Sequence, residues 1–396
     1  MQLTSYAHSI EEIDQLATVG VGEIILSYGP LSRGGGLDLA TVNLLAQYAC
    51  QRELAVSLEW DILVTEQQFA ESCQQFAQLP LELFVGIRVS DFGVMQFIYQ
   101  QHPSLKLIPI LEGSCHNLPA ILSVLELLAG RVKRVVLSIE ISSGELEQII
   151  PEIDLPVELL LLGPIPLYYS PRQLLTPLIK QERSCGELIQ LFATSQEGPH
   201  HGFPLVESDH GTLIYNTRHL WLLNALPRLE QMGLTVGRVD LRAVKDHQQK
   251  GGMWQEIAAL FNQFEESKAI NLKDAYPFNT IHGFFRANKS DVLFPKLKNH
   301  RLTPIGENYL GEVVDVIKGE LLAVVWRRNG FLPPLESSLY LLTPEGKKIN
   351  FRLKWCRDTQ NEPIETPIQK DEIVLINPIK RVSVKSQLYL SCQPGE

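Results

Sequence analysis

Short apolar runs alternate with longer amphipathic stretches through residues 1–275, and this alternation limits the possible folds more than any other feature. Near-continuous apolar strands separated by helices are typical of a parallel sheet buried on both faces. Eight such units predict an α/β fold, a (β/α)8 TIM-like barrel; a doubly wound open sheet is the alternative. The predicted strands are Glu23–Tyr28, Leu54–Trp60, Leu83–Ile87, Leu105–Leu111, Arg134–Ile139, Val157–Leu162, Leu213–Tyr215 and Val236–Leu241. The predicted helices are Asp38–Arg52, Glu66–Gln78, Gly93–Gln101, Pro119–Ala129, Ser143–Ile150 and Arg218–Met232.

The pattern changes near residue 300. Residues 305–396 contain short alternating runs separated by turn dipeptides such as Lys318-Gly319, Asn329-Gly330 and Asn377-Pro378. Such spacing is typical of antiparallel strands joined by tight turns. We therefore expect a C-terminal small antiparallel β-barrel domain, joined to the first domain by a connection over 276–304.

The charge distribution restricts the partners. The chain has a net charge of −10, and residues 300–396 carry 13 Lys and Arg against 12 Asp and Glu, so the acidic excess lies in residues 1–299. A broad nucleic-acid surface needs an excess of basic residues, so only the C-terminal domain is expected to touch a phosphate backbone. No apolar run of membrane-spanning length and no secretory signal occurs, which favours a cytoplasmic protein without membrane contact.

Polar residues follow the predicted strands. In a barrel of this kind, chemistry takes place at the carboxyl ends of the strands. Arginine and tyrosine there suit an anionic small molecule or a nucleotide phosphate, because a guanidinium pairs with such groups through two hydrogen bonds. The alternative is structural, with these charges pairing across the strand ends. The predicted ligand-binding residues are Glu59, Arg88, Glu140, Tyr169, Arg172, Asp240 and Arg242.

Other reactive residue types give weaker signals. The six cysteines show no CxxC spacing, the histidines of residues 195–220 show no HExxH spacing, and no GxSxG motif occurs. Gly113-Ser114-Cys115-His116 places reactive side chains side by side, but neighbouring residues in a turn rarely face one another. The sequence therefore predicts no metal site and leaves the catalytic residues unknown.

Residues 131–176 contain a strand end Leu137-Ser138-Ile139-Glu140, a second strand that stops at Gly163, and the segment Tyr169-Ser170-Pro171-Arg172. This stretch resembles the peptidase U32 family, also called collagenase-like peptidases. Typical members have Leu-Ser-Arg-Glu-Leu-Ser at one strand end, His-Gly at the next, and then Tyr-Ser-Gly-Arg-Cys. The arginine, the histidine and the cysteine of these motifs are replaced by Ile139, Leu162 and Gln173. The matching residues are Ser138, Glu140, Gly163, Tyr169, Ser170 and Arg172.

Two further segments extend this resemblance. Residues 211–220 are similar to the family's strand that leads into an Asn-Ser-Lys-Asp-Leu helix start, and residues 237–242 resemble its Lys-Ile-Glu-Gly-Arg strand, with Asp240 and Arg242 in matching places. The region from Leu310 resembles the β-barrel appended to the branch that hydroxylates transfer RNA. The resemblance thus covers nearly all of the chain.

The resemblance implies both a chemistry and a departure from it. Family members bind a 4Fe-4S cluster through four cysteines, and several serve oxygen-independent hydroxylation of the transfer-RNA wobble uridine, of ribosomal RNA or of the ubiquinone ring. Only Cys185 lies near a family ligand position, and one thiolate cannot hold a cluster. The family cysteine quartet is thus missing, and we expect no cofactor.

Three functions follow from this resemblance. The first is an accessory or cluster-free subunit of a hydroxylation system, acting on the wobble uridine of tRNA beside a cluster-bearing paralogue as heterodimer partner. The second is a U32-type peptidase, a hydrolase. The third is a non-catalytic small-molecule-binding protein.

Overall fold

The structure is a computed structural model that describes residues 1–179, 187–194, 201–286, 308–344 and 346–391. It divides into unit 1, Met1–Asn288, and unit 2, Lys289–Glu396. The connection predicted over 276–304 lies partly outside the described residues.

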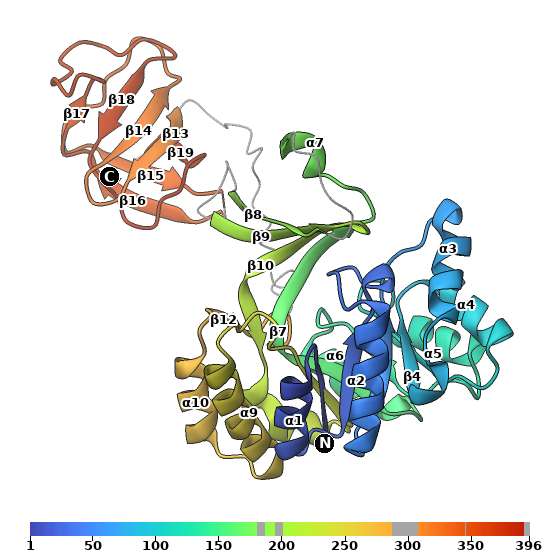
Figure 1. Ribbon diagram of the computed structural model, residues 1–396. Helices are drawn as coiled ribbons and strands as arrows, with labels where there is room; N and C mark the ends of the chain where they lie inside the picture. Colours follow the sequence, from blue (N-terminus) through green and yellow to red (C-terminus); the bar gives the residue numbers. More distant parts are fainter. Residues whose placement is uncertain (180–186, 195–200, 287–307, 345, 392–396) are drawn as a thin grey trace. The chain divides into compact units, whose positions relative to one another are not determined.

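A parallel sheet forms the centre of unit 1 (Figure 1). Its strands pair in the order β5-β4-β3-β2-β1-β11-β7, and β6 pairs with β7. Isolated bridges between Leu107 and Val132 and between Ile110 and Val136 connect the β5 side to the β6 segment. The predicted parallel α/β sheet is therefore confirmed. The strands are β1 (Gln2–Tyr6), β2 (Glu23–Ser27), β3 (Ala55–Trp60), β4 (Gly86–Val89), β5 (Leu107–Pro109), β6 (Val135–Val136), β7 (Val157–Ser170) and β11 (Val236–Val239).

Helices follow most of these strands and pack their apolar faces on the sheet. Side-chain caps define several helix starts: Asp38 and Asn117, for example, accept a hydrogen bond from the backbone three residues on. Ser142 and Glu145 form a reciprocal capping box. None of the helices in the described ranges is long and apolar enough to cross a membrane. The helices are α1 (Ile10–Thr18), α2 (Leu39–Gln51), α3 (Glu66–Ala77), α4 (Phe92–Gln101), α5 (Leu118–Leu127), α6 (Ser143–Ile149), α7 (Thr176–Ile179), α8 (Leu226–Gln231), α9 (His247–Asn262) and α10 (Glu266–Ala275).

Two strand predictions were wrong. The first parallel strand is β1, which was not predicted, whereas Leu213–Tyr215 belongs to β10 (Gly211–Trp221), which pairs antiparallel with β7. The predicted helix over 218–232 is reduced to α8, because its first residues belong to β10. The second error arose because an apolar run alone does not reveal its strand's direction. The two errors offset each other, so the number of parallel strands remains as predicted.

The strand predicted to stop at Leu162 continues as β7 to Ser170. Its outer half forms an antiparallel arm with β10, β9 (His201–Ser208) and β8 (Ile189–Thr194), while β12 (Thr280–Ile281) pairs with His219 and Leu220 of β10. Ser208 Oγ donates to the carbonyl oxygen of Arg33 at 2.9 Å. The arm is thereby attached to the loop between β2 and α2.

Unit 2 is an antiparallel sheet in the order β16-β15-β19-β13-β14-β18-β17. The predicted antiparallel strands of the C-terminal domain are therefore confirmed. Its core includes Leu310, Trp326 and Leu339, all almost fully buried. The predicted turn at Lys318-Gly319 joins β13 to β14, and Gly319 has a φ of +81°, which favours glycine. The strands are β13 (Tyr309–Ile317), β14 (Leu321–Trp326), β15 (Ser338–Leu342), β16 (Lys348–Arg352), β17 (Cys356–Arg357), β18 (Ile373–Ile376) and β19 (Gln387–Leu390).

Candidate ligand-binding site at the strand ends

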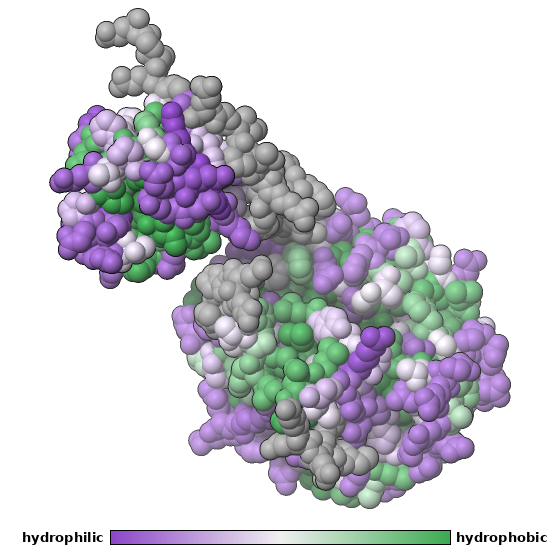
Figure 2. Space-filling view, turned by 90° about the horizontal axis from the view of Figure 1, so that it is seen from above, coloured by the Kyte–Doolittle hydropathy of each residue, from purple (hydrophilic) through white to green (hydrophobic). Residues whose placement is uncertain are grey.

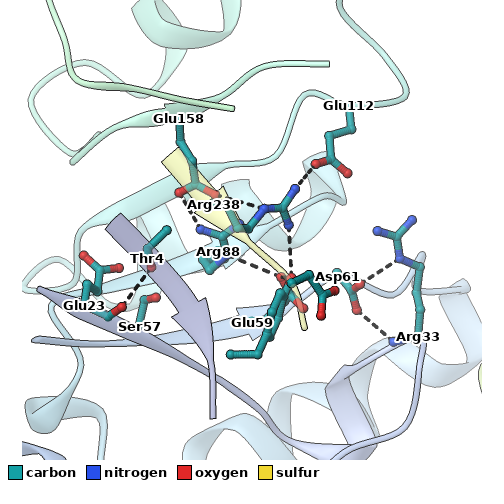
Figure 3. Close-up of polar contacts among 12 residues, drawn as sticks. Thr4, Glu23, Arg33, Ser57, Glu59, Asp61, Arg88, Glu112, Glu158 and Arg238 are labelled. Atoms are coloured by element: carbon teal, nitrogen blue, oxygen red, sulfur yellow. Dashed lines mark hydrogen bonds and ion pairs between the residues drawn. The ribbon is translucent and has the colours of Figure 1, made fainter. Parts of the chain in front are cut away.

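Charged side chains on the parallel strands converge in the interior of unit 1. Side chains alternate between the two faces of a strand, so the neighbours of each inward residue pack against the helices. Figure 3 shows residues of β2, β3, β4, β7 and β11 pointing toward one another. We call the following group the buried charge network: Glu23, Glu59, Arg88, Arg134, Glu158 and Arg238.

Glu158 is the centre of this network and is 0% exposed. It accepts hydrogen bonds from Arg88 Nη1 and Nη2 at 2.7 and 2.8 Å, and from Arg134 Nε at 2.7 Å. Arg238 Nε lies 3.3 Å from the same carboxylate. Burial would raise the pKa of Glu158, but these guanidiniums hold it well below its usual range. Glu158 is therefore ionised and bridges three cations.

Arg134 and Glu59 extend the network toward the two ends of the strands. Arg134 Nη1 and Nη2 each donate to Glu23 at 2.6 Å. At the other end, Arg88 Nε donates to Glu59 at 3.3 Å. Three carboxylates and three guanidiniums thus offset one another, which a buried charge cluster requires.

Tyr6 connects the network to the carboxyl ends of the strands. Its hydroxyl donates to Glu59 Oε2 at 2.8 Å and accepts from Arg238 Nη1 at 3.0 Å. Arg238 Nη2 also donates to Glu112. Burial and the charge of Asp61 raise the pKa of Glu59. Glu59 therefore keeps a proton to higher pH than an ordinary glutamate.

A cavity of about 640 Å³ opens above Glu59 and Arg238. We call it the strand-end cavity, because its floor is formed by the carboxyl ends of the parallel strands and its wall by the antiparallel arm. The polar residues that line it include Tyr6, Arg33, Glu59, Asp61, Glu112, Ser138, Glu140, Tyr215, His219, Arg238, Asp240, Arg242 and Lys245.

Two arginines on the cavity wall are each fixed by one carboxylate. The backbone N–H and Nε of Arg33 donate to the two oxygens of Asp61, both at 2.8 Å. Arg242 donates to Asp240 from Nε at 3.0 Å and from Nη2 at 2.7 Å, and its guanidinium lies 3.5 Å from the centre of the Tyr6 ring. Burial would raise the pKa of Asp240, but Arg242 lowers it to about 2.

The structure brings four of the seven predicted residues to this cavity: Glu59, Glu140, Asp240 and Arg242. Arg88 lies below it, fully buried in the network. Tyr169 stands on the outer half of β7, where its hydroxyl donates to the His210 carbonyl oxygen at 2.8 Å and Arg33 lies 5.2 Å from its ring centre.

Arg172 is the seventh predicted residue, and it follows β7 on the surface. Its backbone N–H donates to Ser170 Oγ, and its carbonyl oxygen accepts from Thr212. Arg172 is not among the residues that line the strand-end cavity.

Several cavity residues were missing from the predicted site. Tyr6 was missed because β1 was not predicted, and Tyr215 because β10 was taken as a short parallel strand. Arg238 could have been predicted from the sequence. It is an arginine inside an apolar strand, and because it lies two residues before Asp240, its side chain points to the same face of the strand as Asp240.

Ser138, His116 and Glu140 form the arrangement that most resembles a nucleophile and its base. His116 Nε2 lies 3.1 Å from Ser138 Oγ and 3.7 Å from Glu140 Oε2. The same nitrogen also lies 3.3 Å from the carbonyl oxygen of Glu112. A catalytic triad uses one ring nitrogen for the serine and the other for the carboxylate, so this geometry is not that of a triad.

The cysteines and the residue at the family cysteine position lie in different environments. Gln173, at the family cysteine position, is exposed. Cys115 and Cys356 are buried, Cys50 is exposed, and Cys185 lies outside the described residues. Within the described ranges, no three or more His, Cys, Asp or Glu side chains are placed to hold a metal ion.

Comparison with known proteins identifies the family. The model of peptidase family U32 matches residues 28–291. The chain therefore belongs to the peptidase U32 family, as the motifs around Ser138 and Tyr169 predicted. No curated protein matches the chain.

Solved structures show low overall similarity. The C-terminal domain of a putative U32 peptidase from Geobacillus thermoleovorans is 13% identical, with 23% of this chain and 99% of that chain covered and a TM-score of 0.20. The U32 peptidase Mk0906 is 11% identical over 41% of this chain and 68% of its own, with a TM-score of 0.33. A DAHP synthase from Thermotoga maritima is 14% identical over 71% and 72%, with a TM-score of 0.34. Membership of the family rests on the sequence match.

Proposed function

We propose that this protein is a cluster-free, ligand-binding subunit of an oxygen-independent hydroxylation system that acts on the wobble uridine of tRNA. A cluster-bearing U32 paralogue, as heterodimer partner, would supply the redox chemistry, and this chain would hold a substrate or cosubstrate. The proposal combines family membership with the strand-end cavity and the substitution of Gln173 for the family cysteine.

The observation that carries the proposal is the strand-end cavity itself. Its arginines are positioned by carboxylates that directly follow two separate strands, and its floor is held by the buried charge network. A site used for binding needs such preorganised donors. This arrangement offers hydrogen-bond donors to a ligand, whereas the Ser138–His116 contact beside it does not have the geometry of a catalytic triad.

Peptidase activity is the second candidate, and the contact of Ser138 with His116 is the observation that favours it. Hydrolysis by this pair would require His116 to take the serine proton while a carboxylate holds its other nitrogen. Glu140 approaches the same nitrogen instead. Binding is therefore the better-supported function.

The proposal also concerns how the parallel sheet of unit 1 closes. We infer that β1 to β7 with β11 form a closed (β/α)8 barrel. Arg88 on β4 reaches Glu158 on β7, and Arg134 beside β6 reaches Glu23 on β2, so strands distant in the sheet order face one another. Unit 2, which we take to be a small β-barrel, would contact the tRNA.

The proposal is tested by deleting the gene and measuring wobble-uridine hydroxylation in digested tRNA by mass spectrometry. We expect the modification to be lost and to return when the wild-type gene is supplied. Copurification of a tagged chain under anaerobic conditions should also recover the cluster-bearing paralogue. Unchanged hydroxylation together with peptide cleavage that is lost in Ser138→Ala would instead establish the peptidase.

A further inference from the structure

We propose that Arg33, Tyr215 and Arg242 form a carboxylate-binding subsite in the strand-end cavity, and that its ligand is a monocarboxylic acid with a flat apolar body. The inference deepens the proposed function and rests on it, because it names the chemical class of the molecule held there. The three side chains come from the β2–α2 loop, from β10 and from the segment after β11, and all three line the cavity.

Each arginine leaves part of its guanidinium available. Arg33 uses Nε for Asp61, and Arg242 uses Nε and Nη2 for Asp240. Among the described residues, none forms a hydrogen bond with Arg33 Nη1 or Nη2, or with Arg242 Nη1. Figure 3 shows the terminal nitrogens of Arg33 pointing away from Asp61. Carboxylate anchors on one edge therefore orient the other edge as a donor for a ligand.

Tyr215 lines the same cavity as these two arginines. Burial raises the pKa of Tyr215, and the charges of Arg242 and Arg33 act on it in the opposite direction. The pairing of β10 with β7 shifts register on each side of Tyr215. Such irregularities redirect a side chain and are frequent beside functional sites. In the described part of the chain, no partner binds the Tyr215 hydroxyl, which remains a protonated donor.

Other residues that line the cavity are apolar. Leu191, Phe192 and Leu205 of the arm line the cavity, as does Phe278. The ring of His219 stacks on Phe278 with a centroid distance of 4.2 Å and an interplanar angle of 23°, which creates a flat surface. Figure 2 shows unit 1 from the side of the arm, with hydrophobic atoms (green) gathered inside a largely hydrophilic rim (purple).

The charges favour a single negative charge on the ligand. Asp61, Glu112 and Asp240 already partner the cationic groups of the cavity. A phosphate dianion would bring two more negative charges among them, and like charges at short range repel. A carboxylate adds one charge and matches the planar donors of Arg33 and Arg242. The volume of about 640 Å³ accommodates an apolar body of drug-like size.

The test uses three probes that share the naphthalene body: 2-naphthoate, its neutral amide 2-naphthamide, which has nearly the same shape, and 2-naphthyl phosphate. Their affinities for the purified full-length chain are measured by isothermal titration calorimetry. We expect 2-naphthoate to bind at least tenfold more tightly than the amide, because a hydrogen bond to a charged group is stronger than one to a neutral group. The phosphate should bind more weakly than the carboxylate.

Variants locate the subsite. Tyr215→Phe removes only the hydroxyl and should weaken 2-naphthoate binding about tenfold, with little change in melting temperature. Arg242→Gln should weaken it further. The matched control is Arg218→Gln. Arg218 lies on β10, the strand of Tyr215, but it is exposed and outside the cavity, so this variant should bind 2-naphthoate like the wild type.

Equal binding of the amide, tighter binding of the phosphate, or no binding of any probe would overturn the inference. Unchanged affinity in a folded Tyr215→Phe protein would do the same. These outcomes are distinguishable from failure of the proposed function. If wobble-uridine hydroxylation still depends on the gene, only the ligand class is wrong, whereas probe binding without that dependence would contradict the hydroxylation role.

Discussion

Replacing Glu158 with glutamine should destabilise unit 1 more than any exposed charge substitution. The change keeps the shape of the side chain but leaves Arg88 and Arg134 without the carboxylate that accepts their hydrogen bonds. Removal of one partner from a buried ion pair costs roughly 3–5 kcal/mol. Because Glu158 is fully buried and bridges three guanidiniums, we expect the upper part of this range.

That cost can be measured by urea denaturation. For a urea dependence of roughly 3 kcal/mol per molar, a loss of 3–5 kcal/mol lowers the midpoint by about 1–1.7 M. Far-ultraviolet circular dichroism reports on unit 1, because all the helices in the described ranges belong to it. A domain's total stability is roughly 5–15 kcal/mol, so the variant should remain foldable at low temperature.

Glu147→Gln provides the matched control. Glu147 also accepts two hydrogen bonds from an arginine, Arg228, at 3.0 and 2.8 Å, but both side chains are about half exposed. Exposed pairs contribute about 0–1 kcal/mol, and the midpoint should shift by a few tenths of a molar at most. Equal, small shifts for the two variants would refute the claim that the buried charge network holds the strands together.

Three further predictions concern separate parts of the molecule. Glu207 is fully buried, and burial raises its pKa, but hydrogen bonds from Leu175 and other neighbours lower it from 4.5 to about 2. The ionised Glu207 therefore stabilises the fold above pH 4.5, and this stabilisation is lost as the pH falls toward 2. In melting curves recorded at a series of pH values, Glu207→Gln should reduce the loss of stability at acid pH. Gly163 has a φ of +149°, and a Cβ there would lie 2.8 Å from the Cβ of Asp240. Gly163→Ala should therefore lower the free energy of unfolding by about 1–3 kcal/mol in urea denaturation. Gly144→Ala in α6, where nothing lies within 4 Å of the added Cβ, should not lower it. Anaerobically purified protein should contain no iron or labile sulfide by chemical analysis; about four irons per chain, lost in Cys185→Ala, would contradict the expected absence of a cluster.

The sequence predicted the parallel sheet and most helices because short apolar strands separated by amphipathic stretches leave few other arrangements. Strand direction was harder to predict. β10 contains a short apolar run at Leu213 and Ile214 that does not reveal the strand's direction, which is set by its antiparallel pairing with β7 and β9. β1 has Leu3 and Tyr6 as its only large apolar residues, so it lacks the apolar run by which the other strands were predicted.

Errors in strand boundaries explain the misplaced site residues. The strand predicted over 83–87 is Gly86–Val89 in the structure, so Arg88 lies inside the strand rather than at its end. β7 passes Gly163 and ends at Ser170, which moves Tyr169 and Arg172 away from the strand-end cavity. Residues whose strand ends were predicted closely, such as Glu59 and Asp240, do reach the cavity.

The most direct test of the account joins the cavity to the cellular reaction. A strain lacking the gene is supplied with wild-type protein, with Tyr215→Phe or with Arg218→Gln, and wobble-uridine hydroxylation is quantified by mass spectrometry of its tRNA. We predict full modification with the wild type and Arg218→Gln, and a clear loss with Tyr215→Phe at equal protein level. Full modification in the strain without the gene would contradict a role for this protein in hydroxylation.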